Sequence, residues 1–218
     1  MLQNNIWEEM FQHEFGKYPA EHLIRFIAQN YYKKERVNTK ILEVGCGPGA
    51  NIWYISREGF DTYGIDGSPT AINTAKKRLK NENLKASLIV GDIIKLPYSD
   101  NFVDSVIDNE CIYSNNLNDA DVILQEVKRV MKKDGLFFSR SFSTDMYIGK
   151  AEDIGRYEYK EATDGVIAHT GFLRLMDKQA IIDLYGKHFE ILSIDKMDYT
   201  RNNGELMISE WIIICKKK

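Results

Sequence analysis

The chain has 218 residues, of which 44% are hydrophobic and 28% are charged, as is usual for one globular domain whose core needs no disulfide staples. Its 29 basic and 32 acidic side chains leave a net charge of −3, which argues against general binding to nucleic acids. No apolar run approaches the ~20 residues of a membrane-spanning helix, and no secretory signal pattern opens the sequence.

The cysteines point to a reducing compartment. Cys46, Cys111 and Cys215 are too few and too scattered for a disulfide framework or a zinc site. We therefore expect reduced thiols, a cytoplasmic protein and no bound metal.

Two segments near the start have helical periodicity. Apolar side chains recur at helical spacing at Trp7, Met10, Phe11 and Phe15 and again at Leu23, Phe26, Ile27 and Tyr31. Pro19 lies between the two segments and is expected to open the second helix. The apolar faces of both helices are expected to pack on the rest of the fold.

A glycine turn follows the first predicted strand, residues 40–44. Its glycines, within residues 45–49, let the backbone turn tightly and approach a ligand closely. A helix is predicted at 50–58, and the free N–H groups at its start suit a carboxylate or a phosphate. Asp66 follows a second apolar run, residues 60–65. Two strand ends, one glycine turn and one acid predict an adenosine-type pocket at the carboxyl edge of a parallel sheet.

From Lys40 onward the pattern alternates between strand and helix. Strands are expected at 40–44, 61–65, 86–90, 104–108 and 135–140, and helices at 50–58, 69–82 and 118–132. Ser68 before Pro69 is a typical helix start. Asn118 is the expected cap of the third helix, and Asp177 the cap of a later one.

The end of the chain differs from this alternation. Residues 189–194 and 208–215 are apolar runs with only loop or turn residues between them. Because no helix fits between them, the two strands should pair antiparallel.

The glycine turn by itself leaves two enzyme classes open. Gly45, Gly47 and Ala50 also satisfy the dinucleotide fingerprint, in which alanine can replace the third glycine. A nicotinamide-dependent oxidoreductase or epimerase would carry another parallel unit at its end, whereas the last two strands of this chain are expected to pair antiparallel.

Further motifs carry a family resemblance. In chain order they are Glu43, the glycine turn, Asp66, Gly91-Asp92, the segment 96–101, the strand end 106–109 and the helix end 126–135. From Thr39 to Phe138 the chain resembles the class I S-adenosylmethionine-dependent methyltransferases that act on small molecules. Tyr113 and Ser114 depart from the pattern, because that family often has histidines there.

The resemblance implies a fold and a cofactor site. The fold would be α/β, a Rossmann-like, mostly parallel seven-stranded sheet with an antiparallel C-terminal strand and helices on both faces. The cofactor would be S-adenosylmethionine, with S-adenosylhomocysteine as product. The implied cofactor residues are Glu43, Gly45, Cys46, Gly47, Gly49, Asp66, Gly67, Ser68, Asp92, Ile93 and Asn109. Asp66 would accept the ribose hydroxyls, and Glu43 would hold the amino group.

The acceptor side is expected to lie outside this core. Within one domain, residues 1–218, we expect a helical lid at 1–36, the cofactor-binding core at 37–140 and an acceptor-binding insertion at 143–172. The insertion has no clean period, and loops of this length are often functional. The candidate acceptor residues are Trp7, Phe11, Tyr18, Glu110, Tyr113 and His169. No catalytic residue is assigned.

The sequence therefore predicts a methyltransferase acting on a small or medium-sized acceptor. The alternatives are an NAD(P)-dependent Rossmann oxidoreductase or epimerase, and a non-catalytic S-adenosylmethionine-binding module. The expected partner is a small-molecule acceptor, without general nucleic-acid binding or membrane association; the sequence makes no prediction of the oligomeric state.

Overall fold

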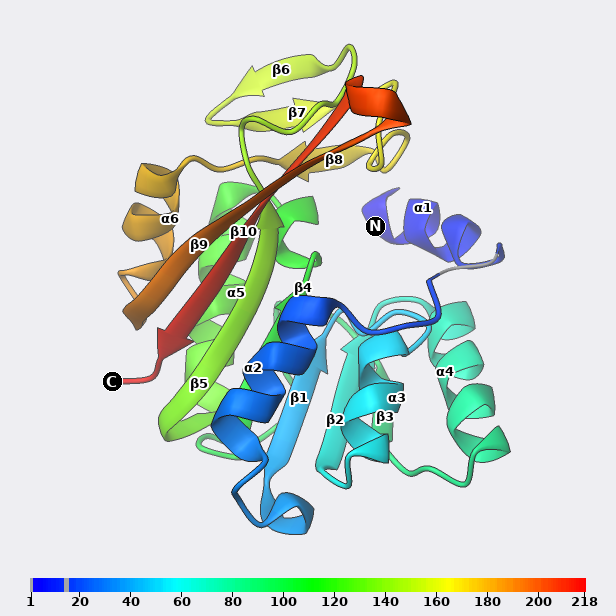
Figure 1. The fold of residues 1–218 in the computed structure, drawn as a ribbon, viewed down its shortest axis with the longest axis vertical. Coiled ribbons are helices and arrows are strands. Elements are labelled where there is room, and N and C mark those ends of the chain that lie inside the picture. Colours follow the sequence, from blue (N-terminus) through cyan, green and yellow to red (C-terminus); the bar gives the residue numbers. More distant parts are fainter. Residues whose placement is uncertain (1, 14–15) are drawn as a thin grey trace.

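The computed structural model describes residues 2–13 and 16–218. Helix α1 (Leu2–Met10) stands apart from the sheet, and α2 (Glu21–Tyr31) crosses one sheet face (Figure 1). Helix α2 begins two residues after Pro19, with Ala20 as its N-cap, so the proline precedes the helix instead of forming its first turn. Phe15, part of the predicted apolar stripe, lies outside the described residues.

Within the described residues, the main sheet has seven strands. They are β1 (Lys40–Val44), β2 (Asp61–Asp66), β3 (Ser87–Val90), β4 (Val103–Asn109), β5 (Met131–Phe142), β9 (Glu190–Arg201) and β10 (Leu206–Lys216). Their order in space is β3-β2-β1-β4-β5-β10-β9. Strands β1 to β5 run parallel, and β10 runs antiparallel to both β5 and β9. The predicted sheet with an antiparallel C-terminal strand is confirmed.

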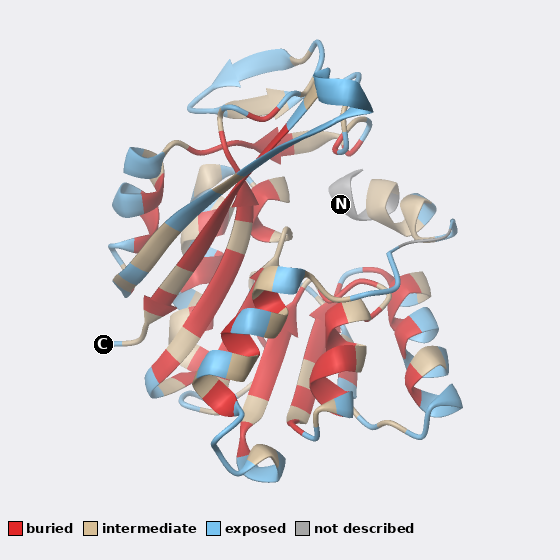
Figure 2. Cartoon of the chain, in the orientation of Figure 1, coloured by how far each residue is buried: buried red, intermediate tan, exposed pale blue. Residues whose placement is uncertain are grey.

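Helices cover both faces of this sheet, as predicted. The remaining ones are α3 (Ala50–Arg57), α4 (Pro69–Asn81), α5 (Leu117–Val130) and α6 (Lys178–Tyr185). On one face Phe26 of α2 packs on Phe138 of β5, with ring centroids 5.3 Å apart. Helices α5 and α6 close the other face, and the central strands between the layers are mostly buried (Figure 2). In the described part of the chain, no helix is both long and apolar enough to cross a bilayer.

The helix caps test the local predictions. Ser68 and Asp177 cap α4 and α6, each with a side-chain oxygen that accepts the backbone N–H three residues on. The prediction of Asn118 as the cap of α5 is wrong. Asn116 accepts the N–H of Asp119 at 3.0 Å instead, because α5 begins at Leu117.

The last two strands are longer than their apolar runs indicate. Beyond Ile194, β9 continues to Arg201 with mostly exposed polar side chains. It is the outer strand of the sheet, and charged side chains on such an edge oppose pairing with another chain. The pairing of β9 with β10 therefore extends well past the hydrophobic core.

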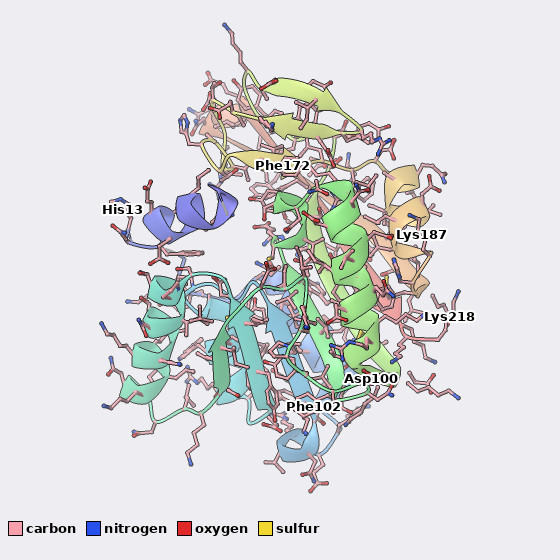
Figure 3. The ribbon with its side chains drawn as sticks, turned by 180° about the vertical axis from the view of Figure 1, so that it is seen from behind. His13, Asp100, Phe102, Phe172, Lys187 and Lys218 are labelled. Carbon is pink, nitrogen blue, oxygen red and sulfur yellow. The ribbon has the colours of Figure 1, made fainter. Side chains whose placement is uncertain are left out.

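A second, smaller sheet forms in the segment without a sequence period. Strands β6 (Glu152–Gly155), β7 (Glu158–Lys160) and β8 (Phe172–Arg174) pair antiparallel. We call residues 143–175 the cap. Figure 3 shows Phe172 at the cap end of the molecule and Asp100 and Phe102 at the opposite end of the main sheet. The cap packs on β10 through its own apolar cluster, which includes Met146, Ile167, Leu173 and Ile208.

Candidate active site

A cavity of about 490 Å³ lies at the carboxyl ends of β1, β2 and β4. Side chains of α1 and of the cap also line it, and Figure 1 shows these two segments above the carboxyl ends of the strands. The strand order reverses between β1 and β4, and open α/β sheets bind ligands at this point. Its volume is in the range of small-molecule sites.

The glycine turn forms the floor of the cavity. Gly45, Gly47 and Gly49 all have left-handed backbones, with φ of 63°, 51° and 82°, which glycine adopts at little cost. A Cβ on Gly45 would lie 2.1 Å from the Cys111 sulfur, and one on Gly49 would lie 2.8 Å from Ala75 of α4. Packing therefore requires glycine at positions 45 and 49. Of the three glycines of the turn, Gly45 and Gly47 line the cavity and Gly49 does not.

Asp66, at the end of β2, holds this turn in place. One carboxylate oxygen accepts the N–H of Gly47 and the other accepts the N–H of Ser68, both at 2.8 Å. Burial raises the pKa of Asp66, and the two N–H groups oppose that rise. Each carboxylate oxygen can accept a second hydrogen bond, so Asp66 can still receive hydroxyl groups from a ligand.

Glu43 presents an oxygen with unused hydrogen-bonding capacity. Asn51 donates from Nδ2 to Glu43 Oε1 at 2.6 Å, and its Oδ1 accepts the N–H of Ala20 at 3.2 Å. The buried Glu43 Oε2 and the buried Asn109 Oδ1 have no hydrogen-bond partner among the described residues. Burial raises the pKa of Glu43 to about 8, and Asn51 opposes the rise.

Asp108 of β4 holds the turn that follows this strand. Its Oδ1 accepts the N–H groups of Cys111 and Ile112, at 2.9 and 3.1 Å, and burial raises its pKa to about 6. This clamp fixes Asn109 and Glu110, which both line the cavity. Glu110 has a left-handed backbone with φ of 61°, a costly conformation that occurs often at functional sites.

A buried ion cluster forms the wall of the cavity away from the glycine turn. Arg140 of β5 contacts Glu210 of β10 at 2.5 Å and Glu110 at 3.2 Å. The Glu210 side chain is 2% exposed and that of Arg140 is 16% exposed, so this pair is shielded from water, whereas the Glu110 side chain is 25% exposed. Tyr199 and Arg201 of β9 continue this wall.

Helix α1 closes the opposite side. Glu8 accepts hydrogen bonds from the hydroxyl groups of both Ser68 and Thr70, at the start of α4. Phe11 lies above the turn, 3.5 Å from the position that a Cβ on Gly47 would take. The N-terminal segment therefore lies over the glycine turn.

The structure brings most of the predicted site residues to this one cavity. Its lining includes Glu43, Gly45, Cys46, Gly47, Asp66, Gly67, Ser68, Asp92, Ile93 and Asn109 of the cofactor set, and Trp7, Phe11, Tyr18, Glu110 and Tyr113 of the acceptor set. Gly49 lies behind the turn. His169 is exposed outside the lining, with its N–H on the Ala162 carbonyl at 2.9 Å; we leave it out of the acceptor site.

Several lining residues were not predicted from the sequence, and five of them carry polar or charged side chains that matter for the site. They are Asn51, Arg140, Tyr199, Arg201 and Glu210. Arg140 and Glu210 had a signal, since each is a charged residue within an apolar strand, a position that charges occupy only when paired. The other three carry none, because their positions depend on the packing of α3 and β9.

Comparisons with known proteins agree with this geometry. A family model described as "Methyltransferase domain" matches residues 35–178. A ubiquinone biosynthesis O-methyltransferase from Pelagibacter ubique is 30% identical over 123 residues, covering 53% of this chain and 50% of its own. A norajmaline N-methyltransferase from Rauvolfia serpentina is 32% identical over 110 residues, covering 49% of this chain and 37% of its own.

A solved structure extends the likeness to the fold. A SAM-dependent methyltransferase from Methanosarcina mazei superposes with a TM-score of 0.72 at 20% identity, over 88% of this chain and 96% of that one. The chain spans half or less of the length of the two curated relatives described above. The family model covers well over half of this chain and includes the glycine turn, Asp66 and the turn after β4. The chain therefore belongs to the methyltransferase-domain family, the class I S-adenosylmethionine-dependent methyltransferases.

Proposed function

We propose that this protein transfers a methyl group from S-adenosylmethionine to a small or medium-sized acceptor and releases S-adenosylhomocysteine. The observation that carries the proposal is a set of acceptor oxygens in one cavity. Glu43 Oε2 and Asn109 Oδ1 are buried without a partner among the described residues, and the Asp66 carboxylate lies at the neighbouring strand end. Such unpaired buried oxygens are costly unless a ligand donates to them.

The residues present fit this cofactor. Its ammonium group needs acceptors, which Glu43 and Asn109 supply. Its ribose hydroxyls need a carboxylate, which Asp66 supplies through strong charge-assisted hydrogen bonds. Its carboxylate suits the backbone N–H groups of the turn before α3, and its adenine suits the edge made by Asp92 and Ile93.

The protein's contribution to the reaction is mainly alignment. When bound, S-adenosylmethionine supplies a methyl carbon on a sulfonium, an excellent leaving group. The glycine turn and Asp66 hold the donor side in place, and α1 and the cap cover it. We propose that the segments 1–36 and 143–172 bind the acceptor between them, through Trp7 and Phe11 on one side and Ile167 on the other. Orientation of this kind can supply about 7–11 kcal/mol.

The two alternatives fit less well. A nicotinamide enzyme would continue its sheet with a parallel unit, whereas β10 runs antiparallel. A non-catalytic binding module would need no room beyond the cofactor, yet the cavity continues past Asn109 to Arg140 and Tyr199. The three free cysteines support work in a reducing compartment, and we propose the cytoplasm.

Thermal unfolding with added ligands tests the proposed cofactor. S-adenosylhomocysteine should raise the melting temperature by mass action and NAD should not. Asp66→Ala should remove most of this shift, because hydrogen bonds to a charged group contribute roughly 1.5–3 kcal/mol each. Asp61→Ala, at the other end of β2, is the matched control and should keep the shift. A shift with NAD alone would overturn the proposal.

A further inference from the structure

The ion cluster of Glu110, Arg140 and Glu210 forms the wall of the cavity away from the glycine turn, and binding of the cofactor does not require it. Glu110, Arg140 and Glu210 line the part of the cavity beyond Asn109. We propose that the Glu110 carboxylate is the general base that takes a proton from a hydroxyl or amino group of the methyl acceptor. Arg140 and Glu210 are then positioning residues that aim Glu110. This inference rests on the proposed methyl transfer and names the acceptor chemistry of the same site.

The first support is the way in which Glu110 is held. It follows Asn109 at the end of β4, so it lies beside the position expected for the methyl group. Its strained backbone is fixed, because its N–H donates to the Arg140 carbonyl at 3.0 Å and its side chain meets the Arg140 guanidinium. Two independent contacts to the same residue therefore determine where the carboxylate points.

The second support is the pairing of Arg140. Its Nε donates to Glu210 Oε2 at 2.7 Å, and its other contacts also go to Glu210 and Glu110. An arginine with two carboxylates has no charge left to hold an acidic acceptor. A carboxylate acceptor would also meet the two glutamates, and like charges at short range repel. The cluster of Glu110, Arg140 and Glu210 therefore favours a neutral or cationic acceptor that has a proton to give. Arg201 of β9 is the other cation among the described residues that line the cavity.

The charges around Glu110 tune it for proton transfer. Burial raises its pKa to about 7, the charge of Arg140 opposes the rise, and the charges of Glu210 and Asp108 add to it. A base is most effective when its pKa is near the working pH. Tyr113 also faces Glu110, but burial raises the pKa of this phenol, so it stays protonated and cannot serve as the base. Burial likewise raises the pKa of the Cys111 thiol.

The proposed step transfers one proton to Glu110 and one methyl group to the acceptor. The acceptor's O–H or N–H proton moves to a Glu110 oxygen while the acceptor's electron pair forms the new bond to the methyl carbon. The electron pair of the broken carbon–sulfur bond remains on the sulfur, which becomes a neutral thioether. Glu110 afterwards gives its proton to water, so the residue returns to its starting state.

The first experiment needs no acceptor. Glutamate labelled with ¹³C at the side-chain carboxyl allows its titration to be followed by NMR in the full protein, and Glu110→Gln assigns the Glu110 signal. We expect a midpoint near pH 7. Arg140→Met should move the midpoint up and Glu210→Gln should move it down, whereas Glu190→Gln, an exposed residue at the far end of β9, should leave it in place. If Glu110 titrates at the usual pH for a glutamate and neither Arg140→Met nor Glu210→Gln moves its midpoint, the proposed role of the cluster is wrong.

The second experiment measures transfer from labelled S-adenosylmethionine to catechol, benzylamine and benzoate. We expect transfer to catechol or benzylamine, little to benzoate, and kcat lower by roughly 10²–10⁴-fold in Glu110→Gln. Glu110→Asp should recover part of the rate. All variants should bind S-adenosylhomocysteine in calorimetry within a few-fold of the unchanged protein, which also reports that they fold.

The outcomes separate the two proposals. Full transfer by Glu110→Gln, transfer to benzoate alone, or no transfer to any probe by a protein that binds S-adenosylhomocysteine would each overturn the base assignment and leave the cofactor proposal standing. Failure of the unchanged protein to bind S-adenosylhomocysteine would instead overturn the proposed function itself.

Discussion

Asn51 donates to Glu43 at 2.6 Å and thereby fixes a carboxyl group whose second oxygen has no partner among the described residues. The same asparagine accepts the N–H of Ala20, which leads into α2. One amide thus ties β1, α3 and the N-terminal segment together at the cavity. This hydrogen bond keeps Glu43 Oε2 available for a donor that none of the described residues supplies.

This arrangement predicts a pH-dependent affinity. Because burial raises the pKa of Glu43 to about 8, the free protein holds a proton there at pH 7. A cationic ammonium favours the carboxylate, so binding of S-adenosylhomocysteine should release that proton. Affinity should therefore rise with pH between 6 and 8, by up to about tenfold per unit, the limit for one proton. Calorimetry in two buffers of different ionisation enthalpy measures both the affinity and the number of protons released on binding.

Glu43→Gln is the control for that prediction. It keeps the shape and the hydrogen bond with Asn51 but has no proton to release. Its affinity should be lower and independent of pH over the same range. A pH slope that survives in Glu43→Gln would assign the released proton to another group.

The cofactor half of the site is predictable because its information is local. The glycine turn, Asp66 and Asp92 each follow an apolar run directly, and parallel strand ends always meet at one edge of a sheet. Gly49 shows the limit of this reasoning. Its left-handed conformation follows from the turn, but its contact with Ala75 of α4, which takes it out of the cavity, depends on tertiary packing.

The acceptor half depends on strand register, which the sequence does not specify. Arg140 and Glu210 are 70 positions apart, and they meet only because β10 pairs with β5 in the observed register, with Glu210 opposite Phe142. A slip of one residue would turn each side chain to the other face. The small sheet of the cap could not be predicted from the sequence either. Strands as short as β7 and β8, of three residues each, leave no detectable hydrophobic period.

The second prediction concerns Gly47. Valine there should lower the affinity for S-adenosylhomocysteine at least tenfold, because its branches would enter the space between the turn and Phe11, and because φ of 51° strains any side chain. Alanine, whose Cβ would only touch Phe11, should have a smaller effect. Isothermal calorimetry measures both variants.

Gly59 supplies the matched control for backbone strain. It has φ of 86°, no described atom within 4 Å of the position that a Cβ would take, and a place at the far end of α3. Gly59→Ala should cost about 1–2 kcal/mol of stability through its left-handed conformation and leave the affinity unchanged. If Gly47→Val binds as tightly as Gly59→Ala, the glycine turn is not part of the binding surface.

The last prediction concerns the attachment of α1. Glu8 is the link, since both of its oxygens accept hydroxyl groups at the start of α4. These bonds from Ser68 and Thr70 lower the pKa of Glu8, so the attachment is present above the ordinary carboxyl pKa and is lost as the pH falls through the lowered value. Glu8→Ala should free α1 at neutral pH. The backbone amides of α1 should then exchange hydrogen for deuterium several-fold faster than in the unchanged protein. S-adenosylhomocysteine should also dissociate faster, because Phe11 no longer covers the glycine turn. Glu9→Ala is the control on the same helix, because Glu9 is exposed and should change neither rate. Equal exchange in the two variants would mean that Glu8 does not hold the helix over the cofactor site.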